Sequence, residues 1–252
     1  MIEIKVKSSI DGTHQPNLFY AAKEKNRPLI VGLHTWSYDR NNQVPKMLPI
    51  AKERDYNLLL PEFRGPNLRS NPACQDACGS QKAKQDVMDA VQYVLENYEI
   101  DKENIFVVGA SGGGTMALLM AAYAPKAFRG VCSFVPIADI GEWYEENPNY
   151  RDGIEACCAG GESFLEECRK RSPITYADEI AKATVKIFTG KWDACVPPHH
   201  GLDLFAKIFK EHPEAKVYFE MFDGGHEMPL HLAFGWVASL MEKKADGSQV
   251  SG

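Results

Sequence analysis

The sequence predicts an α/β fold, in which a mostly parallel β-sheet carries helices on both faces. Wholly apolar runs such as 28–33 (PLIVGL) alternate along the chain with helical patterns. A strand that is apolar on both faces is typical of a parallel sheet covered on two sides, and strands alternating with helices form βαβ units. The 252 residues suit one domain with a large core, which we place at residues 1–244.

Each element is predicted from its local pattern. Residues 2–7 and 17–22 read as an opening antiparallel pair of strands. The later strands are short apolar runs, predicted at 28–33, 56–60, 105–108, 131–135, 185–189 and 217–221. Helical patterns cover 43–54, 81–98, 112–123, 199–211 and 229–244. The helix at 81–98 has the clearest periodicity, because Val87, Val91 and Val94 share one face.

The stretch 141–173 interrupts this alternation, and it is too long for a simple connection. It contains Trp143, Tyr144 and Tyr150, several glycines and three cysteines. We expect a small cap or lid insertion whose three aromatic side chains bind the substrate, although such rings also suit a small core of the insertion itself. The polar tail 245–252 is expected to be disordered.

Composition excludes several classes of function. The net charge of −6 and the absence of a long basic run argue against nucleic-acid binding, and no apolar stretch is long enough for a membrane span. The amino-terminal residues lack the apolar segment of a signal peptide, so we expect a cytoplasmic protein with reduced cysteines. The cysteine spacings do not match a zinc site, and we expect neither a metal nor an organic cofactor. Homo-oligomerisation stays open.

Ser111 is the predicted nucleophile. It lies in Gly-Ala-Ser-Gly-Gly at 109–113, directly after the apolar run IFVV and directly before an Ala-rich helix. A serine on such a turn is held in a strained backbone with its hydroxyl above the sheet. A dinucleotide-binding turn, with Asp139 as its acidic residue, is the rival interpretation. That fingerprint belongs after the first strand of a βαβ unit and does not need Ser111.

His226 and Asp193 are the predicted partners of Ser111, since a serine hydroxyl needs a base to take its proton. In hydrolases whose nucleophile lies in a G-x-S-x-G turn, the order along the chain is Ser, Asp, His. His226 follows the predicted strand 217–221 through a glycine pair, and Asp193 follows the strand 185–189. His231 is the rival base and Asp139 the rival acid. His199 and His200 follow two prolines and are expected to begin a helix.

The oxyanion hole is predicted from two loops. One backbone N–H belongs to Gly112, the residue after the nucleophile, and the other to the loop after the strand 28–33. In that loop Trp36 is preferred and Thr35 is the alternative, while His34 is expected to hold the loop by a hydrogen bond.

Arg64 is expected either to brace the site by pairing with an acid such as Asp86 or to lie on the surface.

Seven segments together resemble the prolyl oligopeptidase-like branch of the α/β-hydrolases. They are GLHTW, PEFRGPN, DVMDAVQYV, VVGASGGG, RSPITYAD, TGKWDACVP and DGGH, and they extend over about residues 1–240. The resemblance implies an eight-stranded sheet flanked by helices. It also implies a triad of Ser111, Asp193 and His226, with the loop at Thr35 and Trp36 in the oxyanion hole.

The departures from this family guide the expected activity. The chain is expected to lack the family's large β-propeller, and its HTW replaces the usual HGG-type oxyanion motif. That motif looks more like single-domain carboxylesterases of acylated sugars or hydroxycinnamoyl esters. We therefore expect a serine hydrolase that cleaves a small-molecule carboxylic ester without a cofactor. A small serine peptidase or aminoacyl hydrolase, and a non-catalytic binding module on the same fold, are the alternatives.

Overall fold

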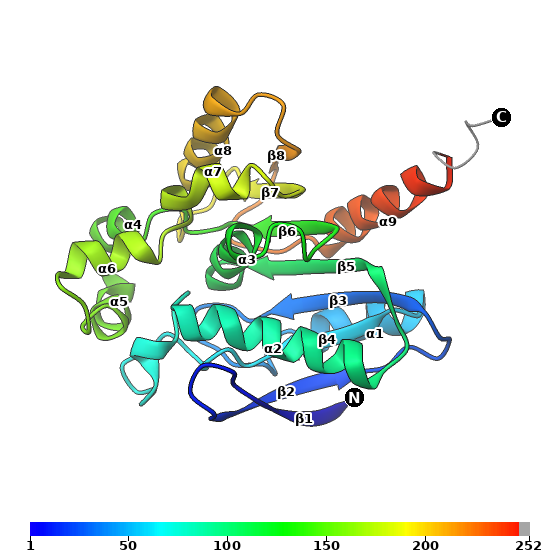
Figure 1. Ribbon diagram of the computed structural model, residues 1–252. Coiled ribbons are helices and arrows are strands. Elements are labelled where there is room, and N and C mark those ends of the chain that lie inside the picture. Colours follow the sequence, from blue (N-terminus) through cyan, green and yellow to red (C-terminus); the bar gives the residue numbers. More distant parts are fainter. Residues whose placement is uncertain (247–252) are drawn as a thin grey trace.

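A computed structural model describes residues 1–246 and shows one eight-stranded sheet (Figure 1). The strands are β1 (Ile2–Lys7), β2 (His14–Tyr20), β3 (Arg27–Leu33), β4 (Asn57–Pro61), β5 (Ile100–Ala110), β6 (Gly130–Phe134), β7 (Val185–Gly190) and β8 (Val217–Phe222). Their order in the sheet is β1-β2-β4-β3-β5-β6-β7-β8. Only the pairs β1–β2 and β2–β4 are antiparallel among these strands. The predicted, mostly parallel α/β sheet is confirmed.

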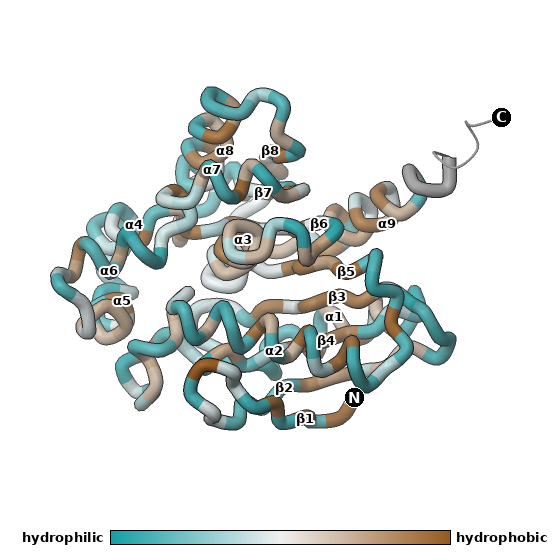
Figure 2. Tube along the Cα trace, in the orientation of Figure 1, coloured by the Kyte–Doolittle hydropathy of each residue, from teal (hydrophilic) through white to brown (hydrophobic). Residues whose placement is uncertain are grey.

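Helices cover both faces of the sheet. The long ones are α1 (Val44–Arg54), α2 (Gln81–Asn97), α3 (Gly112–Tyr123), α8 (His199–Glu211) and α9 (Leu230–Asp246). Helices α2, α3 and α8 share one apolar cluster with the sheet, and α1 and α9 share another on the opposite face. Figure 2 shows the hydrophobic colour concentrated along the central strands β3 and β5. Burial on both faces explains why these strands are apolar throughout.

Three local features differ from the predicted elements. Strand β2 begins at His14 and ends at Tyr20, whereas the prediction was 17–22. Strand β5 begins at Ile100 rather than at residue 105, because Ile100 pairs with Arg27 across a register shift. The polar residues 101–104 interrupt the apolar pattern, so the sequence does not indicate that the strand begins at Ile100. Between β6 and β7 the chain also forms η3 (Pro173–Tyr176) and the one-turn helix α7 (Ala177–Ile180), which are too short to show a helical period.

The segment 141–173 forms short helices beyond the carboxyl ends of the central strands (Figure 1). They are α4 (Ile140–Glu146), η2 (Pro148–Tyr150), α5 (Arg151–Cys157) and α6 (Phe164–Lys170). With η1 (Cys74–Asp76) they surround a third apolar cluster that includes Trp36 and Trp143. This cluster joins the segment to the loop that follows β3.

The carboxyl end of the chain is helical as far as the structure describes it. Helix α9 includes residues 245 and 246 of the predicted tail, and the rest of that tail lies outside the described residues. Within residues 1–246, no helix combines the length and the apolar character needed to cross a bilayer.

Candidate active site

Ser111 occupies the sharp turn between β5 and α3. Its backbone has φ 56° and ψ −126°, a conformation that L-residues rarely adopt. The flanking glycines allow the turn, because a Cβ on Gly109 would lie 2.2 Å from the carbonyl oxygen of Gly113. A Cβ on Gly113 would lie 2.6 Å from the carbonyl oxygen of Leu33. The local geometry therefore has the strained strand-turn-helix form of a nucleophile turn.

Two backbone amides converge beside Ser111. A Cβ added to Gly112 would lie 2.8 Å from the backbone nitrogen of Trp36, so these two segments are in direct contact. The Thr35 amide donates to Asn42 Oδ1 at 3.2 Å and is therefore engaged. Within residues 1–246 the amides of Gly112 and Trp36 have no hydrogen-bond acceptor. Of the two predicted choices in this loop, Trp36 rather than Thr35 has the free N–H that an oxyanion hole requires.

His34 holds the loop as predicted. Its two ring nitrogens lie 3.0 and 2.8 Å from the carbonyl oxygens of Thr35 and Glu62. The imidazole also stacks on Phe63 with ring centroids 3.9 Å apart. Burial lowers the pKa of His34, and the hydrogen bonds to the Thr35 and Glu62 carbonyls oppose that shift because they favour the charged ring.

Asp193 and His226 form a directed pair at the ends of β7 and β8. Asp193 Oδ2 lies 2.7 Å from His226 Nδ1. The other carboxylate oxygen accepts hydrogen bonds from the amides of Cys195 at 2.8 Å and Val196 at 2.9 Å. The Asp193 side chain is fully buried, whereas that of His226 is 29% exposed. The carboxylate thus fixes the imidazole while leaving the ring accessible.

The two loops that carry this pair are locked together by glycine contacts. A Cβ on Gly190 would lie 2.1 Å from the carbonyl oxygen of Gly225, so only glycine allows this approach. The Trp192 amide donates to the Gly224 carbonyl at 2.9 Å, and its indole donates to Asp223 at 2.8 Å. The glycines before Asp193 and before His226 therefore have a positioning role.

The rival acid and bases have other partners or places. Asp139 is the N-cap of α4, where its Oδ1 accepts from the amides of Gly141 and Glu142. His199 and His200 lie on α8 and contact Glu146, and His231 belongs to α9. The structure thus brings His226, and none of these histidines, to Asp193.

Cys195 is a neighbour of the pair that sequence analysis missed. Burial by itself would raise the pKa of this half-buried thiol, but the hydrogen bond with His226, the charge of His226 and the hydrogen bond with Tyr150 together outweigh burial and lower that pKa. Burial also lowers the pKa of His226, but hydrogen bonds with Asp193 and Cys195 outweigh it and raise that pKa from 6.5 to about 9. The sequence did contain a signal for this contact, because Cys195 follows the predicted acid Asp193 by only two residues in the same loop.

A cleft of about 620 Å³ lies beside these residues. Its lining residues are Trp36, Ser37, Leu68, Asn147, Asn149, Tyr150, Asp152, Gly153, Ala194 and Cys195. Ser111 and His226 are not among these lining residues, but Trp36 carries one of the free amides and Cys195 contacts His226. The cleft therefore adjoins the site and is a candidate space for a substrate.

The three predicted aromatic contacts have different positions. Tyr150 lines the cleft, with its hydroxyl 3.7 Å from Cys195 Sγ. Trp143 is completely buried and donates from Nε1 to the Cys195 carbonyl at 2.8 Å. Tyr144 donates to Glu155 and packs on Phe164, away from the cleft lining. Trp143 and Tyr144 therefore support the insertion, and only Tyr150 is placed to touch a substrate.

Comparison with known proteins identifies a family for this chain. A family model described as the Prolyl oligopeptidase family matches residues 42–233. Acylamino-acid-releasing enzyme 1 of Oryza sativa subsp. japonica is 28% identical over 219 residues, which are 80% of this chain and 28% of the rice protein. The chain thus spans less than a third of this curated relative.

Solved structures share the fold. An acylaminoacyl peptidase in complex with Z-Gly-Gly-Phe-chloromethyl ketone is similar with a TM-score of 0.70 and 20% identity, over 89% of this chain and 37% of that one. The S-formylglutathione hydrolase FrmB of Staphylococcus aureus gives a TM-score of 0.67 and 16% identity, over 96% and 93% of the two chains. At these identities the likeness shows an α/β-hydrolase fold.

Proposed function

Because the chain belongs to the prolyl oligopeptidase family, we propose that it is a serine hydrolase that cleaves carboxylic esters through an acyl-enzyme on Ser111. The observation that supports this proposal best is the His226–Asp193 pair, held at 2.7 Å beyond the sheet that also carries the strained Ser111 turn. A nucleophile, a base and an orienting acid are the groups that acyl transfer needs.

The proposed reaction has two halves. Ser111 Oγ attacks the ester carbonyl while His226 takes its proton, and Asp193 stabilises the imidazolium. The oxyanion accepts hydrogen bonds from the amides of Gly112 and Trp36. His226 then protonates the leaving alcohol, and a water molecule, deprotonated by the same histidine, releases the acid from Ser111.

The cleft favours an uncharged substrate. Among its lining residues Asp152 is the only carboxylate, and it forms an ion pair with Arg69. A substrate with a free ammonium group would therefore lack an unpaired counter-charge there. Tyr150 offers an aromatic face, which suits the sugar of an acylated carbohydrate or a hydroxycinnamoyl group.

A second candidate is hydrolysis of N-acylated amino acids or peptides. The rice relative is named an acylamino-acid-releasing enzyme, and the blocked amino end of such a substrate is also uncharged. The chemistry at Ser111 is the same, but the leaving group is an amine.

The deciding experiment compares substrates after the nucleophile has been identified. A fluorophosphonate probe should add one label to the wild type and none to Ser111→Ala, as read by intact mass. p-Nitrophenyl esters should then be cleaved faster than N-acylaminoacyl anilides. Faster anilide cleavage would replace the esterase proposal by the second candidate, and no labelling would support a non-catalytic binding module.

A further inference from the structure

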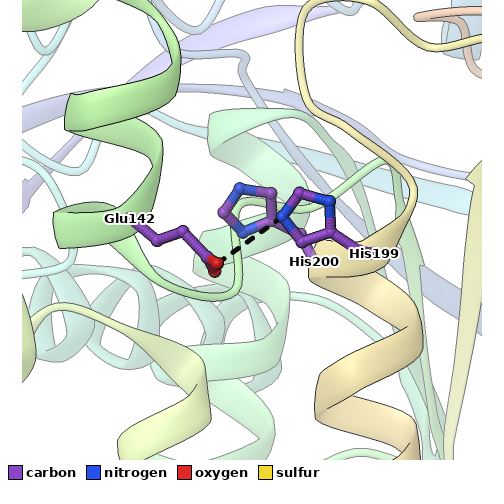
Figure 3. A group of neighbouring side chains, drawn as sticks. All are labelled: Glu142, His199 and His200. Atoms are coloured by element: carbon purple, nitrogen blue, oxygen red, sulfur yellow. Dashed lines mark ion pairs between the residues drawn. The ribbon is translucent and has the colours of Figure 1, made fainter.

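Four potential metal ligands meet where α4 faces the start of α8. Glu142 and Glu146 lie one turn apart on α4, and His199 and His200 are the first residues of α8. Figure 3 shows the Glu142 carboxylate and both imidazoles directed toward one another. This cluster lies outside the proposed triad and joins the 141–173 segment to the main sheet.

Three distances between donor atoms in the cluster are close to those between the ligands of a tetrahedral site. His199 Nε2 lies 3.0 Å from Glu146 Oε1 and 3.7 Å from Glu142 Oε1, and His200 Nε2 lies 3.0 Å from Glu146 Oε2. One donor atom from each of Glu142, His199 and His200 lies within 4.8 Å of the others. Zinc bonds of 2.0–2.2 Å in a tetrahedron place the ligand atoms about 3.3–3.6 Å apart.

We propose that Glu142, Glu146, His199 and His200 form a binding site for one Zn²⁺ ion. Imidazole nitrogen and carboxylate oxygen are both zinc ligands, and two of each give an uncharged four-coordinate complex. The proposal departs from the expectation of no metal, which was based on cysteine spacing alone. It does not depend on the proposed hydrolase activity.

Burial organises one side of this site. The His200 side chain is completely buried, whereas His199 and Glu142 are 37% and 47% exposed and provide an entry path. Binding through His200 Nε2 leaves the proton on Nδ1, so the 3.4 Å contact from the Asp139 amide to Nδ1 is given up. His199 stacks on His200 with centroids 4.9 Å apart, which keeps the two rings in register.

The ion would have a structural role. Helix α4 is already attached to the loop that follows β7, because Trp143 Nε1 and Asn147 Nδ2 both donate to the Cys195 carbonyl. A metal bridging α4 and α8 would fasten both ends of that loop, which contains Asp193. Zinc should therefore stabilise the folded protein, since it binds the folded state preferentially.

The test is titration of the metal-free protein with Co²⁺ as a spectroscopic probe and with Zn²⁺ as competitor. We expect one equivalent to give tetrahedral d–d absorption without the charge-transfer band of a thiolate ligand, so that binding to the cysteines is distinguished. Glu142→Gln and His199→Ala replace exposed ligands and should fold. Each should weaken binding by more than the roughly 10–100-fold that loss of an outer-sphere partner costs.

A matched control comes from the second His/acid cluster, where the partly exposed His212 pairs with Asp178 near Glu211. His212→Ala should leave the Co²⁺ spectrum and affinity unchanged, and Zn²⁺ should raise the melting temperature of the wild type but not of His199→Ala. A thiolate band, the absence of binding, or equal affinity in His199→Ala and wild type would each overturn the proposal.

Discussion

Asp193 uses both of its oxygens to hold one orientation of His226. Oδ1 accepts from two backbone amides while Oδ2 contacts the ring nitrogen. An asparagine that keeps its oxygen on the two backbone amides directs its NH₂ group toward the His226 ring nitrogen. The imidazole then loses the partner that fixes its tautomer and stabilises its charged form.

Asp193→Asn should therefore fold but lower kcat for p-nitrophenyl acetate by about 10³–10⁴-fold, by analogy with the triad template. The control is Asp139→Asn, because asparagine is as good an N-cap as aspartate, and it should change kcat by less than a factor of about ten. A large loss in the control with a small loss in Asp193→Asn would reverse the assignment of the acid.

The pH profile should reveal the thiol beside His226. The imidazole must be neutral to accept the proton of Ser111, and its pKa is raised to about 9. In the wild type kcat/KM should therefore increase with pH through an inflection near that value, because this ratio reports the free enzyme. Removal of the Cys195 thiol takes away one of the hydrogen bonds that raise the pKa.

Cys195→Ala should consequently move the inflection to lower pH and increase the relative activity at neutral pH. Cys74→Ala removes a thiol that lies in η1 and should leave the profile in place. An unchanged inflection in Cys195→Ala would show that the thiol does not influence the base.

At the scale of elements, glycines determine how closely the loops around Ser111 approach. Gly112 touches the Trp36 backbone, with a virtual Cβ 2.8 Å from both its N and Cα atoms. Backbone cannot move aside as a flexible side chain can. Any larger residue must therefore separate α3 from the loop after β3 and open the space between the two free amides.

Gly112→Ala should lower kcat by about 10²-fold or more, comparable to the loss of one oxyanion-hole donor, with a smaller effect on KM. Gly235→Ala on α9 is the matched control, because its Cβ would meet nothing within 4 Å. It should keep full activity and stabilise the fold by up to about 1 kcal/mol through helix propensity, as measured by urea unfolding. Full activity in Gly112→Ala would contradict the oxyanion assignment.

The sequence predicted most elements because each carries a local signature. Apolar runs and helical periodicity locate β3, β7 and α2 to within a residue or two, and the glycines around Ser111 mark the turn. The position of the insertion was predicted from the interruption of the strand-helix alternation at 141–173. Local patterns carry no information on contacts between distant segments, and this is why some predictions failed.

The contacts of the insertion show that limit. Trp143 is an aromatic residue of the kind that often binds a substrate, but it is buried against the loop after β7. Tyr150, seven residues later, reaches the cleft. Cys195 and the cluster of His199 with Glu146 depend on pairing between loops and helices far apart in the chain. Only the fold supplies such proximity.

At the scale of the whole molecule, Arg64 connects three segments. Its guanidinium is 5% exposed and pairs with Asp86 on α2 and with Asp11 in the turn between β1 and β2. The predicted brace is confirmed and the surface alternative is wrong. The same loop carries Asn67, whose amide donates to the Trp36 carbonyl at 2.8 Å, so the ion pairs also support the oxyanion side of the site.

Arg64→Met should destabilise the protein by about 3–5 kcal/mol, because it leaves the buried Asp86 carboxylate without its partner. Arg69→Met removes an exposed ion pair with Asp152 and should cost less than about 1 kcal/mol, with urea unfolding at neutral pH as the measurement for both. Adding Asp86→Leu to Arg64→Met should recover part of the loss, since no uncompensated charge then remains in the core. If both single variants lose the same small amount, Arg64 contributes no more than a surface ion pair, and the position of Trp36 must depend on the loop's backbone contacts instead.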